Sequence, residues 1–255
     1  MSMLDFAINA TIEYIDHMPK SQRKKYGQFF TSKETAAFMA GLFEIPNECQ
    51  TLSILDPGAG SGILSIALLE RLQSFTAIEE IRLVGYENDP NVIELLRSNL
   101  KIACSQSQKK ISFKIVSENY ILSQMADYNL MLGANLEPEK FDFVIGNPPY
   151  MKIAKDAPEA LAMPDVCYGA PNLYFLFASM SMFNLRDGGE MVYIIPRSWT
   201  SGAYFKRFRQ KFLSEGALEH IHLFVSRDKV FEKESVLQET IIIKLRKTRS
   251  KPKTV

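Results

Sequence analysis

Phe141-Asp142-Phe143-Val144-Ile145-Gly146-Asn147-Pro148-Pro149-Tyr150 is the stretch from which the fold of this chain is best deduced. Its first six residues form a short, mostly apolar run, which predicts a buried strand of a parallel sheet. The two prolines after Asn147 carry no N–H donors, so the chain can neither prolong the strand nor enter a helix at once. We therefore predict a rigid, extended turn at the carboxyl end of a strand, where open α/β sheets bind their ligands.

This turn presents three groups that suit a planar amino group. The side-chain oxygen of Asn147 and the carbonyl oxygen of Pro148 are two acceptors, and the ring of Tyr150 is a face for stacking. The alternative is a proline-rich connector with an incidental tyrosine, because Asn-Pro is a common turn opener.

A glycine-rich turn, Asp56-Pro57-Gly58-Ala59-Gly60-Ser61-Gly62, lies between a strand predicted over residues 52–56 and a helix predicted over 63–72. Glycines at alternate positions let the backbone approach a ligand closely, next to the positive end of a helix. Ile63 stands where a dinucleotide-binding pattern needs its last glycine, so the turn favours a nucleotide-like ligand without a pyrophosphate. Asp56, at the tip of the strand, is placed to hold a cationic amino group.

Two further strands also end in polar residues. The strand predicted over residues 81–86 ends at Glu87, where a carboxylate accepts both hydroxyls of a ribose in nucleotide-binding folds. Capping of the next helix is the alternative role, and Asp89 suits that role better. The strand predicted over residues 111–116 ends in Ser117-Glu118-Asn119-Tyr120.

The remaining segments complete an α/β pattern without repeats. Helices are predicted over residues 3–17, 33–43, 172–185 and 197–213, with another beginning near residue 91, and strands over 190–195, 218–225 and 237–245, the last returning antiparallel. Residues 151–171 show no periodicity and are predicted as a mobile loop that serves as a lid or substrate-binding segment. Gly188-Gly189 is predicted as the turn into the fifth strand, and the basic residues of 197–213 as a solvated helix face.

Bulk properties narrow the class of protein. The chain of 255 residues is 46% hydrophobic and 23% charged, which is ordinary for a globular domain, and its net charge of +1 neither suggests nor excludes a nucleic-acid partner. The three cysteines lie far apart and form no metal-ligand pattern with the histidines, which indicates a reducing compartment. No apolar run is long enough to span a membrane, and we find no signal peptide, so the prediction is a cytoplasmic protein.

Taken together, these motifs resemble the adenine-N6 DNA methyltransferases of the γ arrangement, from restriction–modification systems, over about residues 26–247. Gly27-Gln28-Phe29-Phe30-Thr31 resembles their N-terminal cofactor motif, residues 56–62 their glycine loop, and residues 147–150 their catalytic motif. The resemblance implies a catalytic set of Asn147, Pro148, Tyr150 and Phe231, and a set that binds S-adenosylmethionine, formed by Phe30, Thr31, Asp56, Gly58, Gly60, Gly62, Glu87, Asn88 and Glu118. Asn119 is the alternative to Glu118 as the residue that contacts the adenine of the cofactor. The resemblance also implies that the reaction needs no metal.

The resemblance also implies the fold: a Rossmann-like class I S-adenosylmethionine-dependent methyltransferase fold, with seven mostly parallel strands and an antiparallel last strand. Residues 1–247 would be the catalytic domain, with residues 1–25 an N-terminal helix and basic connector, and residues 248–255 a basic tail. In this family a target-recognition domain follows the last strand, and the sequence stops there, so we expect either an excised catalytic domain or a subunit that borrows recognition from elsewhere. Recognition of double-stranded DNA is therefore expected to use a separate domain or specificity subunit.

Three alternatives stay open at this point. The catalytic motif is shared with RNA adenine methyltransferases and protein glutamine methyltransferases, although the N-terminal cofactor motif favours DNA. A catalytically silent, methyltransferase-like binding subunit is the third alternative. The one minor departure from the family pattern is Ser32, which stands where a proline is usual.

Overall fold

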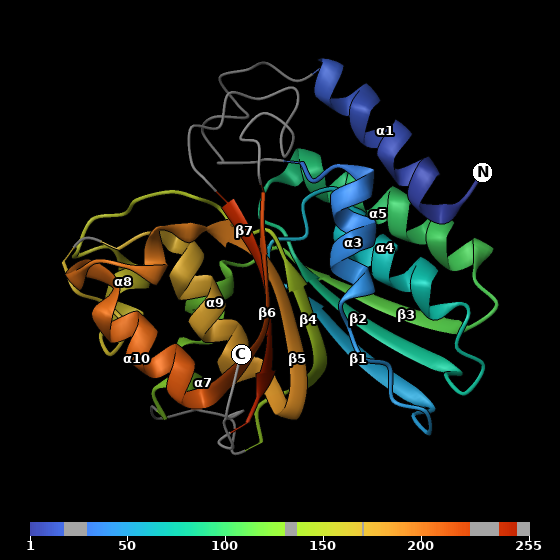
Figure 1. The fold of residues 1–255 in the computed structure, drawn as a ribbon. Coiled ribbons are helices and arrows are strands. Elements are labelled where there is room, and N and C mark those ends of the chain that lie inside the picture. The colour runs from blue at the N-terminus through green and yellow to red at the C-terminus, as the bar shows by residue number, and fades with distance from the viewer. Residues whose placement is uncertain (18–29, 131–136, 170, 225–239, 249–255) are drawn as a thin grey trace.

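The computed structural model describes residues 1–17, 30–130, 137–169, 171–224 and 240–248. Its strands form a seven-stranded sheet in the order β3-β2-β1-β4-β5-β7-β6 (Figure 1). Their bounds are β1 Thr51–Asp56, β2 Glu80–Tyr86, β3 Lys110–Val116, β4 Phe141–Gly146, β5 Leu185–Pro196, β6 Gly216–Leu223 and β7 Thr240–Lys247. The first five strands pair in parallel, and β7 runs antiparallel to both of its neighbours, β5 and β6. The predicted fold class is therefore confirmed.

Helices cover both faces of the sheet (Figure 1). One face packs against α1 (Met3–His17), α3 (Lys33–Gly41), α4 (Ile63–Leu72) and α5 (Pro90–Gln106). The other packs against α6 (Tyr120–Ser123), α7 (Met125–Tyr128), α8 (Pro158–Ala162), α9 (Leu173–Asn184) and α10 (Lys206–Glu215). Among the described residues, no helix combines the length and the apolar character needed to cross a bilayer.

Local sequence explains where the main helices begin. Asp89 caps α5 by accepting a hydrogen bond from the N–H of Asn91 at 3.0 Å, and Pro90 occupies the first helical position, where a missing N–H costs nothing. The capping role proposed as the alternative for Glu87 thus belongs to Asp89. Asn172 caps α9, which is apolar on nearly every side because it lies between the sheet and α10.

The segment after the predicted catalytic turn, residues 147–150, differs from its prediction. Residues 151–171 were predicted to lack regular structure, yet they contain α8 and a bridge between Lys152 and Asn172. Small and apolar side chains in and after α8 are buried: Ala160, Ala162, Met163 and Val166. Their contacts join them to the core that also contains α9. This segment is therefore a packed part of the domain, and its order comes from tertiary burial rather than from periodicity.

The prediction of a single helix over residues 197–213 was wrong for the first half of that range. Two short 3₁₀ helices, η1 (Arg197–Thr200) and η2 (Ala203–Phe205), precede α10. Gly202 between them has φ +77°, a conformation that interrupts a helix. Arg209 then fixes the turn, because its guanidinium donates to the carbonyl oxygens of Trp199 and Ser201 at 2.9 Å. The basic face of α10 is thus not merely solvated.

The predicted turn at Gly188-Gly189 is also a different structure. Both glycines lie inside β5, where the pairing register with β4 jumps from Leu185 opposite Phe141 to Glu190 opposite Phe143. The extra residues form a bulge, and Gly188 has φ +80° there.

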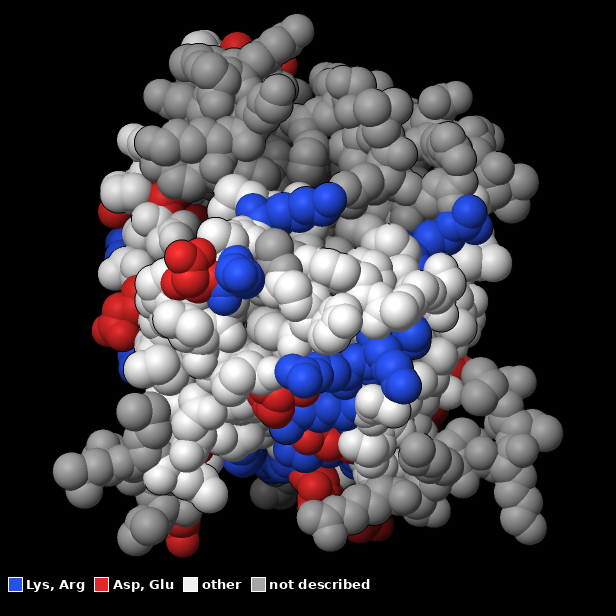
Figure 2. Space-filling view, turned by 90° about the vertical axis from the view of Figure 1, so that its left-hand side faces the viewer, with Lys and Arg blue, Asp and Glu red and all other residues white. Residues whose placement is uncertain are grey.

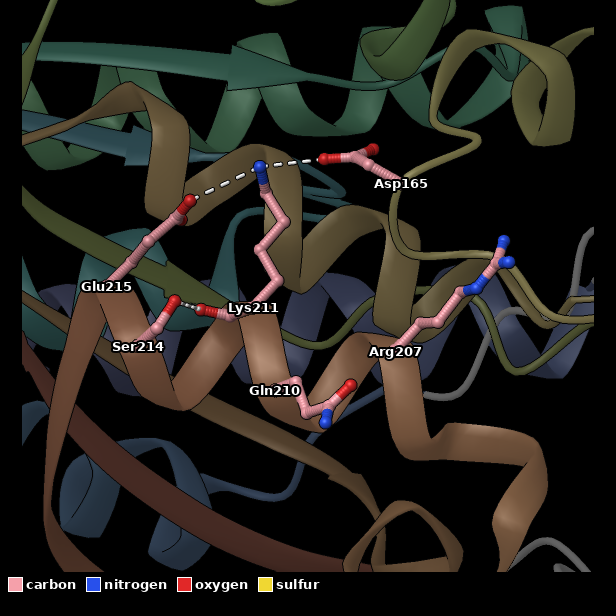
Figure 3. Close-up of a pocket in the computed structure, with 6 residues that line it drawn as sticks. All are labelled: Asp165, Arg207, Gln210, Lys211, Ser214 and Glu215. Carbon is pink, nitrogen blue, oxygen red and sulfur yellow. Dashed lines mark hydrogen bonds and ion pairs between the residues drawn. The ribbon is translucent and has the colours of Figure 1, made fainter.

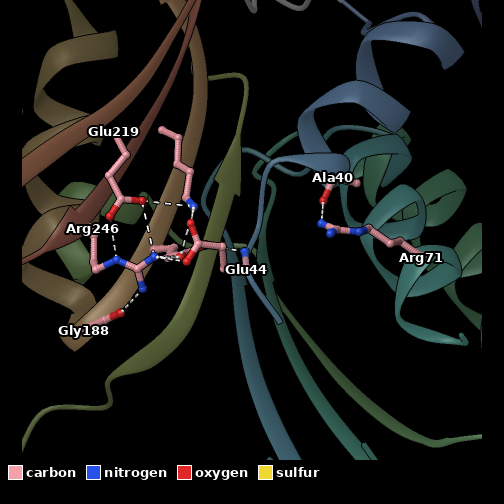
Figure 4. Close-up of polar contacts among 8 residues, drawn as sticks. Ala40, Glu44, Arg71, Gly188, Glu219 and Arg246 are labelled. Carbon is pink, nitrogen blue, oxygen red and sulfur yellow. Dashed lines mark hydrogen bonds and ion pairs between the residues drawn. The ribbon is translucent and has the colours of Figure 1, made fainter. Parts of the chain in front are cut away.

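An ionic cluster joins the segment after α3 to the sheet (Figure 4). Lys244 lies 2.8 Å from a carboxylate oxygen of Glu44, 3.2 Å from one of Glu190 and 3.0 Å from one of Glu219. Arg246 contacts the same three carboxylates. The three acidic groups lie close enough together to hold a metal ion, but two cationic side chains already pair with all three. The cluster is a structural clamp.

Candidate active site

Three of the predicted site residues meet at one edge of the sheet because of strand order. β1 lies between β2 and β4 and is parallel to both, so Asp56, Glu87 and Asn147 all follow the carboxyl ends of adjacent strands. The glycine loop also approaches the catalytic turn. A Cβ added at Gly58 would lie 3.8 Å from the carbonyl oxygen of Asn147 and 3.9 Å from the Cα of Pro148.

The catalytic turn is held by hydrogen bonds on both sides. The side-chain nitrogen of Asn147 donates to Oγ1 of Thr31 at 3.2 Å, which joins the N-terminal cofactor motif to the turn. The hydroxyl of Tyr150 donates to Oδ1 of Asn147 at 2.8 Å and to the carbonyl oxygen of Ile194 at 2.9 Å. Burial raises the pKa of Tyr150, so the phenol stays protonated and remains a donor. The Tyr150 ring meets the Tyr174 ring edge-on, with centroids 6.4 Å apart.

Asp56 is a buried carboxylate with an unused acceptor. Its Oδ2 accepts a hydrogen bond from the hydroxyl of Ser65 at 2.7 Å, whereas Oδ1 has no hydrogen-bond partner among the described residues. Burial raises the pKa of Asp56 to about 7, and the negative charge of Glu87 adds to the shift. A buried acidic group with a perturbed pKa and an unused oxygen fits a site for a cationic ligand.

Glu87 holds the glycine loop from the neighbouring strand. Its Oε2 accepts from the backbone N–H of Gly60 at 3.0 Å, and its Oε1 from that of Asp89 at 2.9 Å. Burial raises the pKa of Glu87, and the backbone donors offset part of that effect. Gly60 and Gly62 have φ of +53° and +87°, so the loop needs residues without a side chain at both positions.

The remaining predicted site residues differ in burial and in contacts. Phe30 is half-buried beside Thr31, whereas Asn88 and Glu118 are exposed. Asn119 caps α6 by accepting from two backbone N–H groups at 3.1 Å, so its carbonyl oxygen already has a structural role. Phe231 lies outside the described residues.

Sequence reasoning missed two residues that shape the site. Ser65 lies inside α4 and reads as an ordinary helical residue, but it supplies the one described hydrogen bond to Asp56. Tyr193, on β5, packs so closely on Gly146 that a Cβ at position 146 would overlap its ring. The local sequence carries no signal for either contact, because both join residues of different elements.

Comparison with solved structures defines the class of protein. A Listeria monocytogenes protein assigned to the class I S-adenosylmethionine-dependent methyltransferases superposes with a TM-score of 0.70 over 99% of this chain and 71% of its own, at 18% sequence identity. At that identity the match concerns the fold. The chain thus has the fold of the class I S-adenosylmethionine-dependent methyltransferases.

Sequence comparison then gives the family. The model of the Eco57I restriction-modification methylase family matches residues 65–231, well over half of the chain, and this chain belongs to that family. It is 36% identical over 88% of its length to the type II methyltransferase M.BsuBI of Bacillus subtilis. It is also 34% identical over 98% of its length to the type II methyltransferase M.PstI of Providencia stuartii. The matches cover 44% and 47% of these two relatives, so the chain spans about half their length.

Proposed function

We propose that this chain transfers the methyl group of S-adenosylmethionine to the exocyclic N6 of an adenine flipped out of double-stranded DNA, in the cytoplasm, as the modification activity of a restriction–modification system. The observation that carries the proposal is the juxtaposition of the Asn147-Pro148 turn with the glycine loop at Gly58. It brings acceptors for an amino group beside a loop suited to a nucleoside cofactor.

The residues of the glycine loop and its neighbours fit this cofactor. In the proposed site, Asp56 holds the ammonium group through its unused Oδ1, and Glu87 accepts the ribose hydroxyls. Gly58 and Gly60 leave room for the cofactor, and Gly62 lets the loop pack against Leu96, 2.8 Å from where its Cβ would lie. Thr31, with Phe30 and the exposed Asn88 and Glu118, completes the set. When bound, S-adenosylmethionine supplies a methyl group activated by a sulfonium, so the reaction needs no metal.

The catalytic turn acts on the amino group. An adenine amino nitrogen is a poor nucleophile because its lone pair is delocalised into the ring. Acceptance of its two N–H bonds by Oδ1 of Asn147 and the carbonyl oxygen of Pro148 favours a more tetrahedral nitrogen. The same oxygens stabilise the positive charge that develops as the nitrogen forms its new bond to carbon. The rest of the rate gain comes from positioning.

A base stacked in a duplex cannot reach this turn, so the adenine has to flip out. Tyr150 on one face, and Phe231 on the other, would replace the lost stacking at about 1–3 kcal/mol per base. We further propose that residues 1–247 form the catalytic domain and that target recognition comes from another domain or a specificity subunit. The partial coverage of the two type II relatives supports this division.

The test is labelled methyl transfer from S-adenosylmethionine to unmethylated bacterial DNA, followed by nucleoside analysis. We expect label in N6-methyl-2′-deoxyadenosine, and a panel with RNA and glutamine-containing peptides separates the two alternative substrates. In Asn147→Ala, turnover should fall about 100-fold or more, because an acceptor used in the transition state is lost, while calorimetry should show unchanged binding of S-adenosylmethionine. Near-normal methylation by Asn147→Ala would refute the role of the turn.

A further inference from the structure

The first turn of α10 and two tyrosines beside it form an exposed surface that the proposed methyl transfer does not use. Lys206 and Arg207 are exposed, and Tyr168 and Tyr204 are 58% and 39% exposed. The guanidinium carbon of Arg207 lies 6.0 Å from the centroid of the Tyr168 ring. A Cβ added at Gly169 would lie 3.1 Å from the Tyr204 ring, so both tyrosines belong to the same patch. We call Tyr168, Tyr204, Lys206 and Arg207 the α10 surface.

The positive charge of the α10 surface is not neutralised within the described part of the chain. Figure 2 shows a group of lysine and arginine side chains on this side of the molecule, with acidic side chains beside some of them. Nearer the carboxyl end of α10 the surface forms a shallow depression (Figure 3). There, Lys211 lies 2.7 Å from a carboxylate oxygen of Asp165 and 3.3 Å from one of Glu215. Lys206 and Arg207 form no such ion pair with any described residue; Arg207 donates a hydrogen bond to a backbone carbonyl and lies over the Tyr168 ring. These two cations therefore remain available.

Helix stability does not explain their position. The amino end of a helix carries a partial positive charge, so cations in the first turn are unfavourable by a few tenths of a kcal/mol or more. The first turn of α10 begins with Lys206 and Arg207 and holds no acidic residue. A sequence selected for stability alone would favour the opposite charge there.

The α10 surface lies at the same edge of the sheet as the catalytic turn. β5 is parallel to β4, and η1 and η2 follow its carboxyl end before α10 begins. Contacts continue from the turn to η2: the Tyr174 ring lies 6.4 Å from Tyr150 and 6.3 Å from Phe205, and the hydroxyl of Tyr174 lies 3.2 Å from that of Ser198. A duplex whose base occupied the site would extend along this edge.

We propose that the α10 surface binds the phosphate backbone of duplex DNA beside the flipped base, an inference that rests on DNA being the substrate. Lys206 and Arg207 would each neutralise one phosphate, and the hydroxyls of Tyr168 and Tyr204 would contact neighbouring phosphate oxygens. Lysine, arginine and tyrosine side chains are among the usual partners of phosphates, and such contacts carry no sequence information. The surface thus supplies positioning that is independent of any recognition domain.

The experiment compares the full chain with the double variant K206Q/R207Q. Fluorescence anisotropy with a labelled duplex of about 20 base pairs gives the affinity as salt rises. Two lost phosphate contacts should reduce the slope of log K against log salt by about 1.8, so that between roughly 50 and 200 mM salt the wild type loses about 12-fold more affinity than the variant. The matched control K101Q/K114Q removes two exposed lysines from α5 and β3, on the other side of the molecule, and should keep the wild-type slope (Figure 1).

Further variants guard against an effect on folding. R207K keeps the charge and should keep the wild-type slope, whereas the single variant R207Q should reduce the slope by about 0.9. An equal loss in R207K and R207Q would mean that Arg207 is structural and would overturn the proposal. Unchanged DNA binding in K206Q/R207Q, or an equal effect in K101Q/K114Q, would also overturn it. The proposal would also be overturned if K206Q/R207Q lost affinity for single-stranded RNA but kept its affinity for duplex DNA. Methyl transfer by the wild type is scored separately, so failure of the proposed reaction remains distinguishable from failure of this surface.

Discussion

In the proposed site, the buried carboxylate of Asp56 should make the affinity for S-adenosylmethionine depend on pH. Its pKa is raised to about 7, mainly by burial, so at pH 6 most molecules carry a protonated, neutral Asp56. Only the ionised form can pair with the ammonium group of the cofactor. The affinity for S-adenosylmethionine should therefore rise as the pH increases from 6 through 7.

The magnitude follows from the two ionised fractions. With a pKa near 7, Asp56 is roughly 9% ionised at pH 6 and about 76% ionised at pH 7.5, a ratio near eight. An α-amino group with a pKa of about 7.8 loses some of its charge over the same interval, which lowers the gain to about fivefold. Above about pH 7.4, midway between the two pKa values, the affinity should fall again, because the ammonium group itself deprotonates.

Isothermal titration calorimetry at pH 6 and pH 7.5 measures this ratio. Asp56→Asn should bind more weakly at pH 7.5 and lose the rise between the two pH values, because an amide does not ionise in this range. Ser65→Ala provides a second test. The Ser65 hydroxyl lowers the pKa of Asp56, so its removal should shift the rise in affinity to higher pH. An equal rise in wild type and Asp56→Asn would refute the pairing of Asp56 with the ammonium group.

Three further outcomes are expected. Gly146→Ala should lower the free energy of unfolding by about 1–3 kcal/mol in chemical denaturation, because the new Cβ overlaps the Tyr193 ring. Lys244→Met should lower it by about 3 kcal/mol, because buried carboxylate charge loses a cation, whereas the same change at the exposed Lys33 should leave it unaltered. Tyr150→Phe should methylate DNA within a few-fold of wild type, because stacking needs a ring and no hydroxyl, and a loss as large as that of Tyr150→Ala would contradict this.

The sheet, and the positions of Asp56, Glu87 and Asn147 at one edge of it, were predictable because their signals are local. Each of the strands β1, β2 and β4 is an apolar run that ends at a polar or glycine-rich turn, and parallel strands bring such ends to one edge. The meeting of Gly58 with the Asn147-Pro148 turn follows from that arrangement alone. The N-terminal motif was also predictable as far as Thr31, which contacts Asn147.

The parts that could not be predicted depend on contacts between distant residues. Periodicity over residues 197–213 indicates one helix, but the guanidinium of Arg209 binds carbonyl oxygens from the preceding turn and stabilises a break at Gly202. α8 is short and proline-bounded, and burial of alanines such as Ala160 against other elements gives it its order. Such tertiary contacts override local propensity.

The hydroxyl of Tyr150 makes two hydrogen bonds that matter for the proposed action of the Asn147–Tyr150 turn. Sequence reasoning used only the ring, yet the hydroxyl divides its one proton between Oδ1 of Asn147 and the carbonyl oxygen of Ile194. An incoming amino group can therefore take over Oδ1 while the hydroxyl keeps Ile194, and no buried donor is left unpaired. Exchanging one neutral hydrogen bond for another adds little to binding of the base in its ground state. As the amino nitrogen becomes positive, however, its hydrogen bond to Oδ1 becomes charge-assisted and roughly twice as strong. In the proposed reaction, the turn would thus stabilise the transition state more than the bound base, which is the condition for catalysis.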